Sequence, residues 1–148
     1  MALEATMRAA DELRRTAAQL SSTRALWRPG GIARHTVEIV AHCAAHGRFH
    51  AAVIAGAALP YRTADELDRV VDSCKSLDAA LAFFDASIGE LIRAIESLPE
   101  ARFSEVMTMP WGERAPVPFG LLMAALHIQY HLGQVCQIQA MLGDDQQY

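Results

Sequence analysis

The segment from Ala115 to Gly143 contains no Asp, Glu, Lys or Arg, and its apolar residues recur around the whole circumference of a helix. A helix that is apolar on all sides is buried on all sides, so other helices or a second copy of the chain must pack around it. The segment has no run of ~18 consecutive apolar residues, so it does not predict a membrane span. It predicts a helix that packs into the core of a helical protein.

Helical periodicity covers most of the remaining chain. The predicted helices span residues 3–20, 32–57, 63–97 (with an interruption at 73–76) and 118–143, and residues 99–118 form a long structured connection. Thr63 and Glu66 have the spacing of a capping box, Pro118 suits a first helical turn, and Gly143 suits a helix end. Four helices of this length predict an all-α four-helix bundle, with residues 1–148 as one domain.

Composition excludes several classes of protein. The chain is 52% hydrophobic and 20% charged, with a net charge of −4, which argues against a basic nucleic-acid-binding surface. The first residues lack a signal-peptide pattern, so we expect no membrane association. Cys43, Cys74 and Cys136 are odd in number and show no CxxC spacing, which predicts free thiols in a reducing cytoplasm.

Two pairs of histidines carry the chemical signal. His127 and His131 lie four residues apart on the last predicted helix, and His42 and His46 form a second such pair on the helix predicted for residues 32–57. An i,i+4 pair can direct both imidazoles to one metal ion, and facing helices are the usual way in which bundles hold metals. The alternative for any single histidine is a buried core residue with a hydrogen-bond partner. Position 128 is Ile, so the pair is not the HExxH motif of zinc proteases.

An all-histidine set favours a divalent transition metal over Mg²⁺ or Ca²⁺, which prefer oxygen ligands. Zn²⁺ or Ni²⁺ is the expected ion, with Fe²⁺ as the alternative.

The stretch 127–135, followed by Met141-Leu142-Gly143-Asp144, resembles the C-terminal signature of the DinB/YfiT-like superfamily. Residues 39–46 resemble the segment that carries its first metal ligand, and Trp27-Arg28-Pro29 resembles the preceding loop, so the resemblance spans roughly residues 25–145. It implies a four-helix bundle, commonly dimeric, with one divalent metal held by His42, His127 and His131. It also implies kinship with transferases and isomerases that use mycothiol or bacillithiol.

Several roles stay open at this point. His46 is an alternative ligand, a partner of a ligand, or a proton shuttle. Glu38 is placed to accept a hydrogen bond from a metal-bound imidazole, or else to form a salt bridge with Arg34. Gln134 either packs or forms a hydrogen bond within the bundle. Four loop residues are candidates for a substrate pocket, with an arginine positioning an anionic substrate, although the tryptophans also suit packing; these four are Trp27, Arg28, Trp111 and Arg114.

The apolar sides opposite the histidines predict a homodimer, unless the chain's own 99–118 connection covers them. The residues expected at this interface are Leu121, Leu122, Ala125, Ile128, Leu132, Cys136 and Ala140 of one helix, and Val37, Val40, Ala44, Ala51 and Ala55 of the other.

Two functions follow from these patterns. The first is a metal-dependent enzyme, a thiol-dependent S-transferase or isomerase or a hydrolase, that acts on a small molecule with a small-molecule thiol and an electrophile as partners. The second is a non-catalytic metal- or ligand-binding dimer, a stress-related module, which the lack of an acid–base carboxylate near the histidines favours.

Overall fold

The computed structural model describes residues 1–109 and 112–144. Its elements are α1 (Ala2–Ala18), α2 (Ser22–Ala25), α3 (Thr36–Ala55), α4 (Ala64–Ser73), α5 (Leu77–Glu96), the 3-10 helix η1 (Glu100–Ser104), β1 (Val106–Thr108), β2 (Arg114–Pro116) and α6 (Val117–Met141). Helices dominate, as the sequence predicts, and the break expected at residues 73–76 separates α4 from α5.

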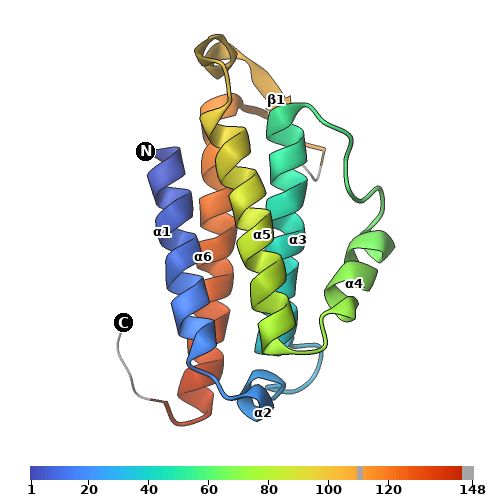
Figure 1. The fold of residues 1–148 in the computed structure, drawn as a ribbon, viewed down its shortest axis with the longest axis vertical. Coiled ribbons are helices and arrows are strands. Elements are labelled where there is room, and N and C mark those ends of the chain that lie inside the picture. Colours follow the sequence, from blue (N-terminus) through green and yellow to red (C-terminus); the bar gives the residue numbers. More distant parts are fainter. Residues whose placement is uncertain (110–111, 145–148) are drawn as a thin grey trace.

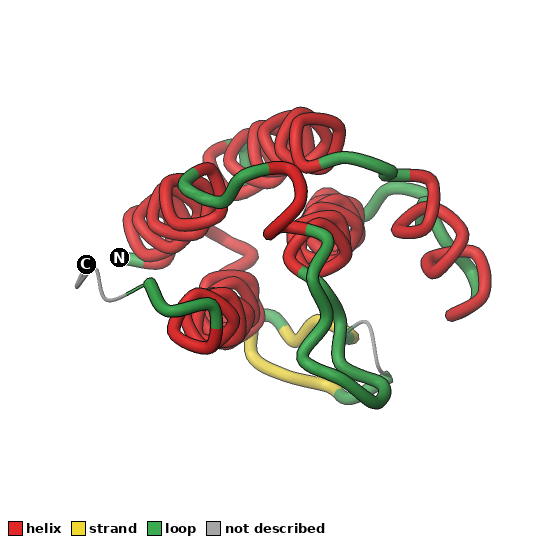
Figure 2. The backbone as a smooth tube through the Cα atoms, turned by 90° about the horizontal axis from the view of Figure 1, so that it is seen from below, coloured by secondary structure: helices red, strands yellow, loops and turns green. Residues whose placement is uncertain are grey.

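Four long helices, α1, α3, α5 and α6, form the bundle (Figure 1). The α1 helix packs against α6, and α3 packs against both α5 and α6. The α4 helix lies outside the bundle beside α3, as the end-on view shows (Figure 2). The connection that contains α4 returns the chain along the bundle, so α3 and α5 run in the same direction (Figure 1).

Polar side chains fix where the helices begin. Ser76 accepts a hydrogen bond from the Ala79 amide at the start of α5, and Thr63 accepts one from the Glu66 amide at the start of α4. The Glu66 carboxylate in turn accepts a hydrogen bond from the Arg62 amide. These bonds satisfy amide groups that a helix start leaves free, and each stabilises the helix by about 1 kcal/mol. The N-cap predicted at Thr63 is therefore confirmed.

The core consists of apolar faces that the helices turn toward one another. Its largest fully buried side chains include Leu13 of α1, Phe84 and Leu91 of α5, and Leu121 and Ile128 of α6. Burial of each such side chain contributes about 2 kcal/mol of hydrophobic free energy. This core holds α3 and α6 side by side, which is the condition for a site between them.

The α6 helix is not buried on every side, and this corrects the sequence interpretation. Leu121, Ala125 and Ile128 were expected at a dimer interface, but they lie in the chain's own core, where α1 packs on α6. Val37, Val40, Ala44 and Ala51 of α3 are likewise buried in a helix that packs on α5. The large exposed residues of α6 lie elsewhere, at Phe119, Leu126, Tyr130 and Met141.

The connection before α6 contains a short antiparallel hairpin that the sequence did not predict. Met107 pairs with Ala115 across β1 and β2, and both residues are buried. The hairpin covers the end of the bundle where α6 begins (Figure 1). Among the described residues, no helix has the length and apolar character needed to cross a membrane.

Candidate metal centre

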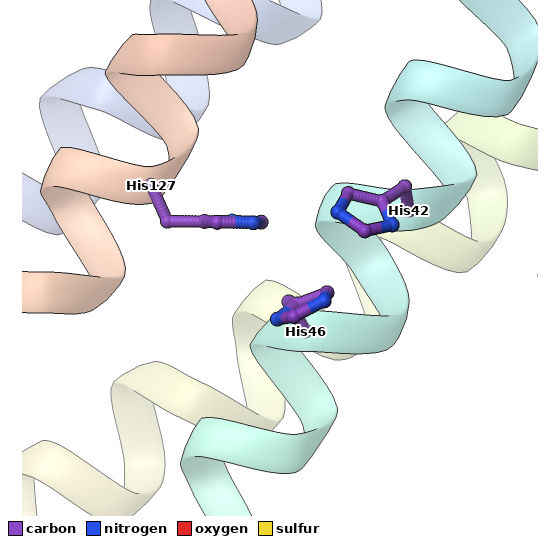
Figure 3. Close-up of side chains that lie close together, drawn as sticks. All are labelled: His42, His46 and His127. Atoms are coloured by element: carbon purple, nitrogen blue, oxygen red, sulfur yellow. The ribbon is translucent and has the colours of Figure 1, made fainter. Parts of the chain in front are cut away.

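Four imidazoles converge between α3 and α6. His42 and His46 lie one turn apart on α3, and their ring centroids are 4.4 Å apart. The His127 ring on α6 lies 4.4 Å from the ring of His46 and 5.3 Å from that of His42. His131, one turn further along α6, lies 4.8 Å from His42 and 4.5 Å from His127. Figure 3 shows His42, His46 and His127 turned toward one another across the two helices. We call these four residues the histidine cluster.

Burial keeps the histidine cluster neutral. Desolvation, assisted by nearby imidazoles and by Arg34, lowers the pKa of His42 to about 3 and that of His46 to about 4. Burial and four neighbouring imidazoles, those of His46, His131, His42 and His50, lower the pKa of His127 to about 2. Burial also lowers the pKa of His131, against the opposing effect of its hydrogen bond to Gln134. Neutral imidazoles are the form that binds a metal ion.

The residues present fit a metal ion. The Nδ1 atoms of His42 and His46 are buried and have no hydrogen-bond partner in the part of the chain that the structure describes. Each such atom costs about 1–3 kcal/mol if nothing satisfies it. Ligation satisfies these atoms, and imidazole nitrogens suit Zn²⁺, Ni²⁺ or Fe²⁺.

Two sets of three residues have ligand atoms within 4.8 Å of one another. The first set is His42, His46 and His127, and the second is Cys43, His127 and His131. The three ligands implied by the sequence resemblance, His42, His127 and His131, are divided between these sets, and His127 belongs to both. Neither set contains all three expected ligands, and His46 stands with His42 and His127 in the first set.

The thiol of Cys43 is fully buried, and this burial raises its pKa above the ordinary range. Cys43, Cys74 and Cys136 are all free, as the sequence predicted.

Gln134 is the residue that orients His131. The Nδ1–H of His131 donates to Oε1 of Gln134 over 2.7 Å, which leaves the His131 Nε2 lone pair available. Gln134 donates through its own Nε2 to the Tyr130 hydroxyl at 3.2 Å. The Nε2 atoms of His131 and His127 lie 3.2 Å apart, so both face one point. The i,i+3 spacing of His131 and Gln134 was the sequence signal for this contact.

Glu38 lies at the start of α3, and its hydrogen bonds and ion pair go to His35 and Arg28 rather than to the histidine cluster. Its carboxylate accepts a hydrogen bond from the His35 amide, and the Glu38 amide donates to the His35 ring, which completes a capping box. Its salt-bridge partner is Arg28 rather than the expected Arg34. The structure thus gives Glu38 a local role in starting α3.

The four residues predicted to line a pocket do not lie together. Trp27 is half-buried against the core, and Arg28 donates to the carbonyl of Ala33 and to Glu38 before α3 begins. Arg114 is exposed on β2, in the hairpin at the opposite end of the bundle (Figure 1). Trp111 lies outside the described residues.

The cavity that reaches the histidine cluster lies instead between α3 and α4. It has a volume of about 540 Å³, and its walls include His42, His46, Arg34 and Arg62. The sequence indicated Arg34 only as a salt-bridge partner of Glu38, and no sequence pattern indicated a role for Arg62. Arg62 precedes α4, where spacing gives no direction for a side chain, and Arg34 precedes α3, which begins at Thr36 rather than at the predicted residue 32.

The family comparison agrees with this architecture. The family model of the DinB superfamily matches residues 5–135, and the chain belongs to that superfamily. None of the proteins with curated functions matches it.

Three solved structures share the fold at low sequence identity. Mycothiol-dependent maleylpyruvate isomerase superimposes with a TM-score of 0.75 at 15% identity, and a histidine-to-alanine variant of it with 0.78 at 13%. Each comparison covers 90% of this chain but 59% of the isomerase, so this chain spans well under two thirds of that protein. A conserved protein from Enterococcus faecalis superimposes with a TM-score of 0.74 at 16% identity, covering 96% of this chain and 95% of that one.

Proposed function

We propose that the histidine cluster binds one divalent transition metal ion and that the protein is a thiol-dependent transferase or isomerase acting on a small molecule. The observation that carries this proposal is the convergence of four neutral imidazoles, two of which have buried Nδ1 atoms without a partner. His42, His127 and His131 are the proposed ligands, with His46 as the alternative. Zn²⁺ or Ni²⁺ is the proposed ion, with Fe²⁺ as the alternative.

The protein holds the imidazole rings of the proposed metal site in a fixed orientation. Gln134 fixes the His131 ring so that its Nε2 faces His127. Residues that hydrogen-bond a ligand in this way usually raise metal affinity by 10- to 100-fold. When bound, a divalent metal ion supplies a Lewis acid that lowers the pKa of a coordinated thiol or water.

The cavity between α3 and α4 gives a small molecule access to His42 and His46. Its volume of about 540 Å³ lies within the ordinary range for small-molecule sites. The name of the mycothiol-dependent maleylpyruvate isomerase supports a thiol as the co-reactant, because that enzyme shares the fold over 90% of this chain.

Cobalt substitution tests the proposal directly. The protein is loaded with Co²⁺ and titrated with mycothiol, bacillithiol or glutathione, and sulfur-to-cobalt charge-transfer absorption reports a thiolate bound to the metal. We expect this absorption with at least one thiol, together with turnover of a model electrophile. Full metal loading without thiolate absorption or turnover would contradict the enzyme assignment.

A non-catalytic metal-binding module is the second candidate. The observation in its favour is that, among the residues that the structure describes, no carboxylate is a cause of the lowered pKa values in the histidine cluster. Such a module binds metal with the same stoichiometry, but the ion is closed to added thiols. The cobalt spectra therefore separate the two candidates.

A further inference from the structure

The cavity between α3 and α4 has a mixed lining that indicates a particular kind of ligand. Phe49, Leu59 and Leu67 give it an apolar wall, and Arg34 and Arg62 give it two cations. The histidine cluster contributes His42 and His46 to the same lining. A ligand that fits these surfaces has an apolar body and an anionic group.

Within the described part of the chain, neither Arg34 nor Arg62 forms an ion pair. Arg28, in contrast, forms an ion pair with Glu38, whereas among the described residues no carboxylate lies within salt-bridge distance of Arg34 or Arg62. Asp68 is the one acidic residue of the cavity lining, so two positive charges face one negative charge there. An unpaired guanidinium at a cavity wall can bind a carboxylate through two parallel hydrogen bonds.

The positive charge of Arg34 also lies close enough to the histidine cluster to affect the pKa values of its imidazoles. Its charge is among the causes that lower the pKa of His42, His46 and His131. An anion held by Arg34 would therefore lie within electrostatic reach of the same imidazoles.

The second cavity beside Arg34 lacks these features. It lies between α3 and α6, has a volume of about 610 Å³, and contains no histidine in its lining. Its polar side chains apart from Arg34 are the neutral Gln134 and Gln137. The cavity between α3 and α4 is therefore the better placed for an anionic reactant.

We propose that the cavity between α3 and α4 binds an organic acid, whose carboxylate pairs with Arg34 and Arg62 while its apolar body packs on Phe49 and Leu67. This assignment rests on the proposed function, because it treats the histidine cluster as the reaction centre and names the class of its substrate. Arg34 is a substrate-binding residue in this scheme.

Calorimetric titration with benzoate and with benzamide tests the proposal, because the two probes share a body and differ in charge. The variants are Arg34→Gln, Arg62→Gln and, as a control on α4 outside the cavity lining, Arg69→Gln. We expect benzoate to bind at least tenfold more tightly than benzamide, and Arg34→Gln to remove about tenfold of the benzoate affinity, as expected for loss of a charge-assisted hydrogen bond. Arg69→Gln should bind benzoate as the unaltered chain does.

Each titration is done with metal-free and with Zn²⁺-loaded protein, and bound zinc is measured by elemental analysis. Arginine-dependent benzoate binding in a chain that holds no zinc would support the cavity proposal and contradict the metal site. Zinc binding together with equal affinities for benzoate and benzamide, or with an unchanged Arg34→Gln, would overturn the cavity proposal alone. Benzoate binding that needs zinc but not Arg34 would place the carboxylate on the metal and also overturn it.

Discussion

Gln134 shows how one uncharged side chain can orient an imidazole that we propose as a metal ligand. Neutral imidazole has one donor and one acceptor nitrogen, and the tautomer decides which atom a metal can meet. The bond from His131 Nδ1 to the Oε1 acceptor of Gln134 assigns the proton to Nδ1, while the Gln134 Nε2 donates to the Tyr130 hydroxyl. The lone pair of the His131 Nε2 is therefore available to a metal ion in the metal-free protein.

Replacement of Gln134 by Leu should lower zinc affinity by 10- to 100-fold, because His131 loses the acceptor that fixes its tautomer. Gln134→Glu keeps an acceptor at the same place and should retain most of the affinity. Competition with a chromophoric zinc chelator at pH 7 measures both variants. Equal affinities for Gln134→Leu and the unaltered chain would show that the hydrogen bond does not support ligation.

The ligand set is tested by single histidine replacements. We expect His131→Ala to lose stoichiometric metal and His46→Ala to keep it with reduced affinity, because His131 has a fixed tautomer and His46 does not. Elemental analysis of the purified variants measures the bound ion. Loss in His46→Ala with retention in His131→Ala would instead select the set of His42, His46 and His127.

The sequence predicted the meeting of the two histidine pairs, because their i,i+4 spacing and apolar surroundings place both pairs on inward-facing stripes. It did not predict the arginines around the site. Arg28 and Arg114 lie in predicted connections, where periodicity gives no direction for a side chain. Arg34 was expected inside a helix that in fact begins two residues later, at Thr36. The structure assigns Arg34 to the cavity and Arg28 to Glu38, and it separates Arg114 from both.

Among the elements, α6 and the hairpin make a close contact at Gly120. A Cβ atom added at Gly120 would overlap the Met107 sulfur and lie 3.3 Å from the Met109 sulfur. Both methionines are buried, so they have little room to move. Because Gly120 has no Cβ atom, the hairpin can pack directly against the first turns of α6.

Gly120→Ala should therefore destabilise the protein by about 1 kcal/mol, since the overlap exceeds the gain in helix propensity. Gly89→Ala on α5 is the matched control, because its nearest contact is the exposed end of Arg93 at 3.4 Å. That control should gain up to about 1 kcal/mol from helix propensity. Urea unfolding of both variants measures the difference, and a stabilised Gly120→Ala would contradict the close seating of the hairpin.

Helices and strands differed in how well the sequence predicted them. The long helices show many turns of apolar periodicity, and the predicted ranges lie within a few residues of α1, α3, α5 and α6. The hairpin has strands of three residues, too short for an alternating pattern to be visible. The position of α4 beside α3 depends on tertiary packing, which local spacing does not encode.

At the scale of the whole molecule, the histidines make folding sensitive to acid. The pKa values of His42, His46, His50 and His127 lie between about 2 and about 4 in the folded chain, well below their ordinary value of 6.5, with burial as the main cause. Below pH 6.5 the unfolded chain binds protons that the folded chain does not, so stability falls as the pH falls.

The metal-free protein should be most affected between pH 6.5 and pH 4.5, before carboxylates begin to titrate. Each imidazole contributes at most about 1.4 kcal/mol per pH unit in this range. Urea midpoints at pH 8, 7 and 5 measure the effect, and the first two should agree while the third is clearly lower. The same midpoint at pH 7 and pH 5 would show that the histidines are not buried as the structure places them.

The exposed face of α6 suits a second copy of the chain. Phe119, Leu126, Tyr130 and Met141 follow helical spacing, and their side chains are about half exposed or more. No charged residue occurs from 115 to 143 to separate them. Aromatic residues and methionine without charges are typical of the buried part of an interface. We propose that this face, rather than the face buried under α1, forms the homodimer.

A two-fold interface uses the same surface on both copies, so each substitution in it changes two residues of the interface. Leu126→Glu would place two carboxylates in the proposed interface, so it should convert a dimer into a monomer at micromolar concentration. Phe103→Glu on η1 is the matched control, because Phe103 is 44% exposed and Leu126 is 47% exposed. Sedimentation velocity should show a dimer for the unaltered chain and for Phe103→Glu. A monomeric unaltered chain at these concentrations would contradict the dimer, and a dimeric Leu126→Glu would place its interface on another face.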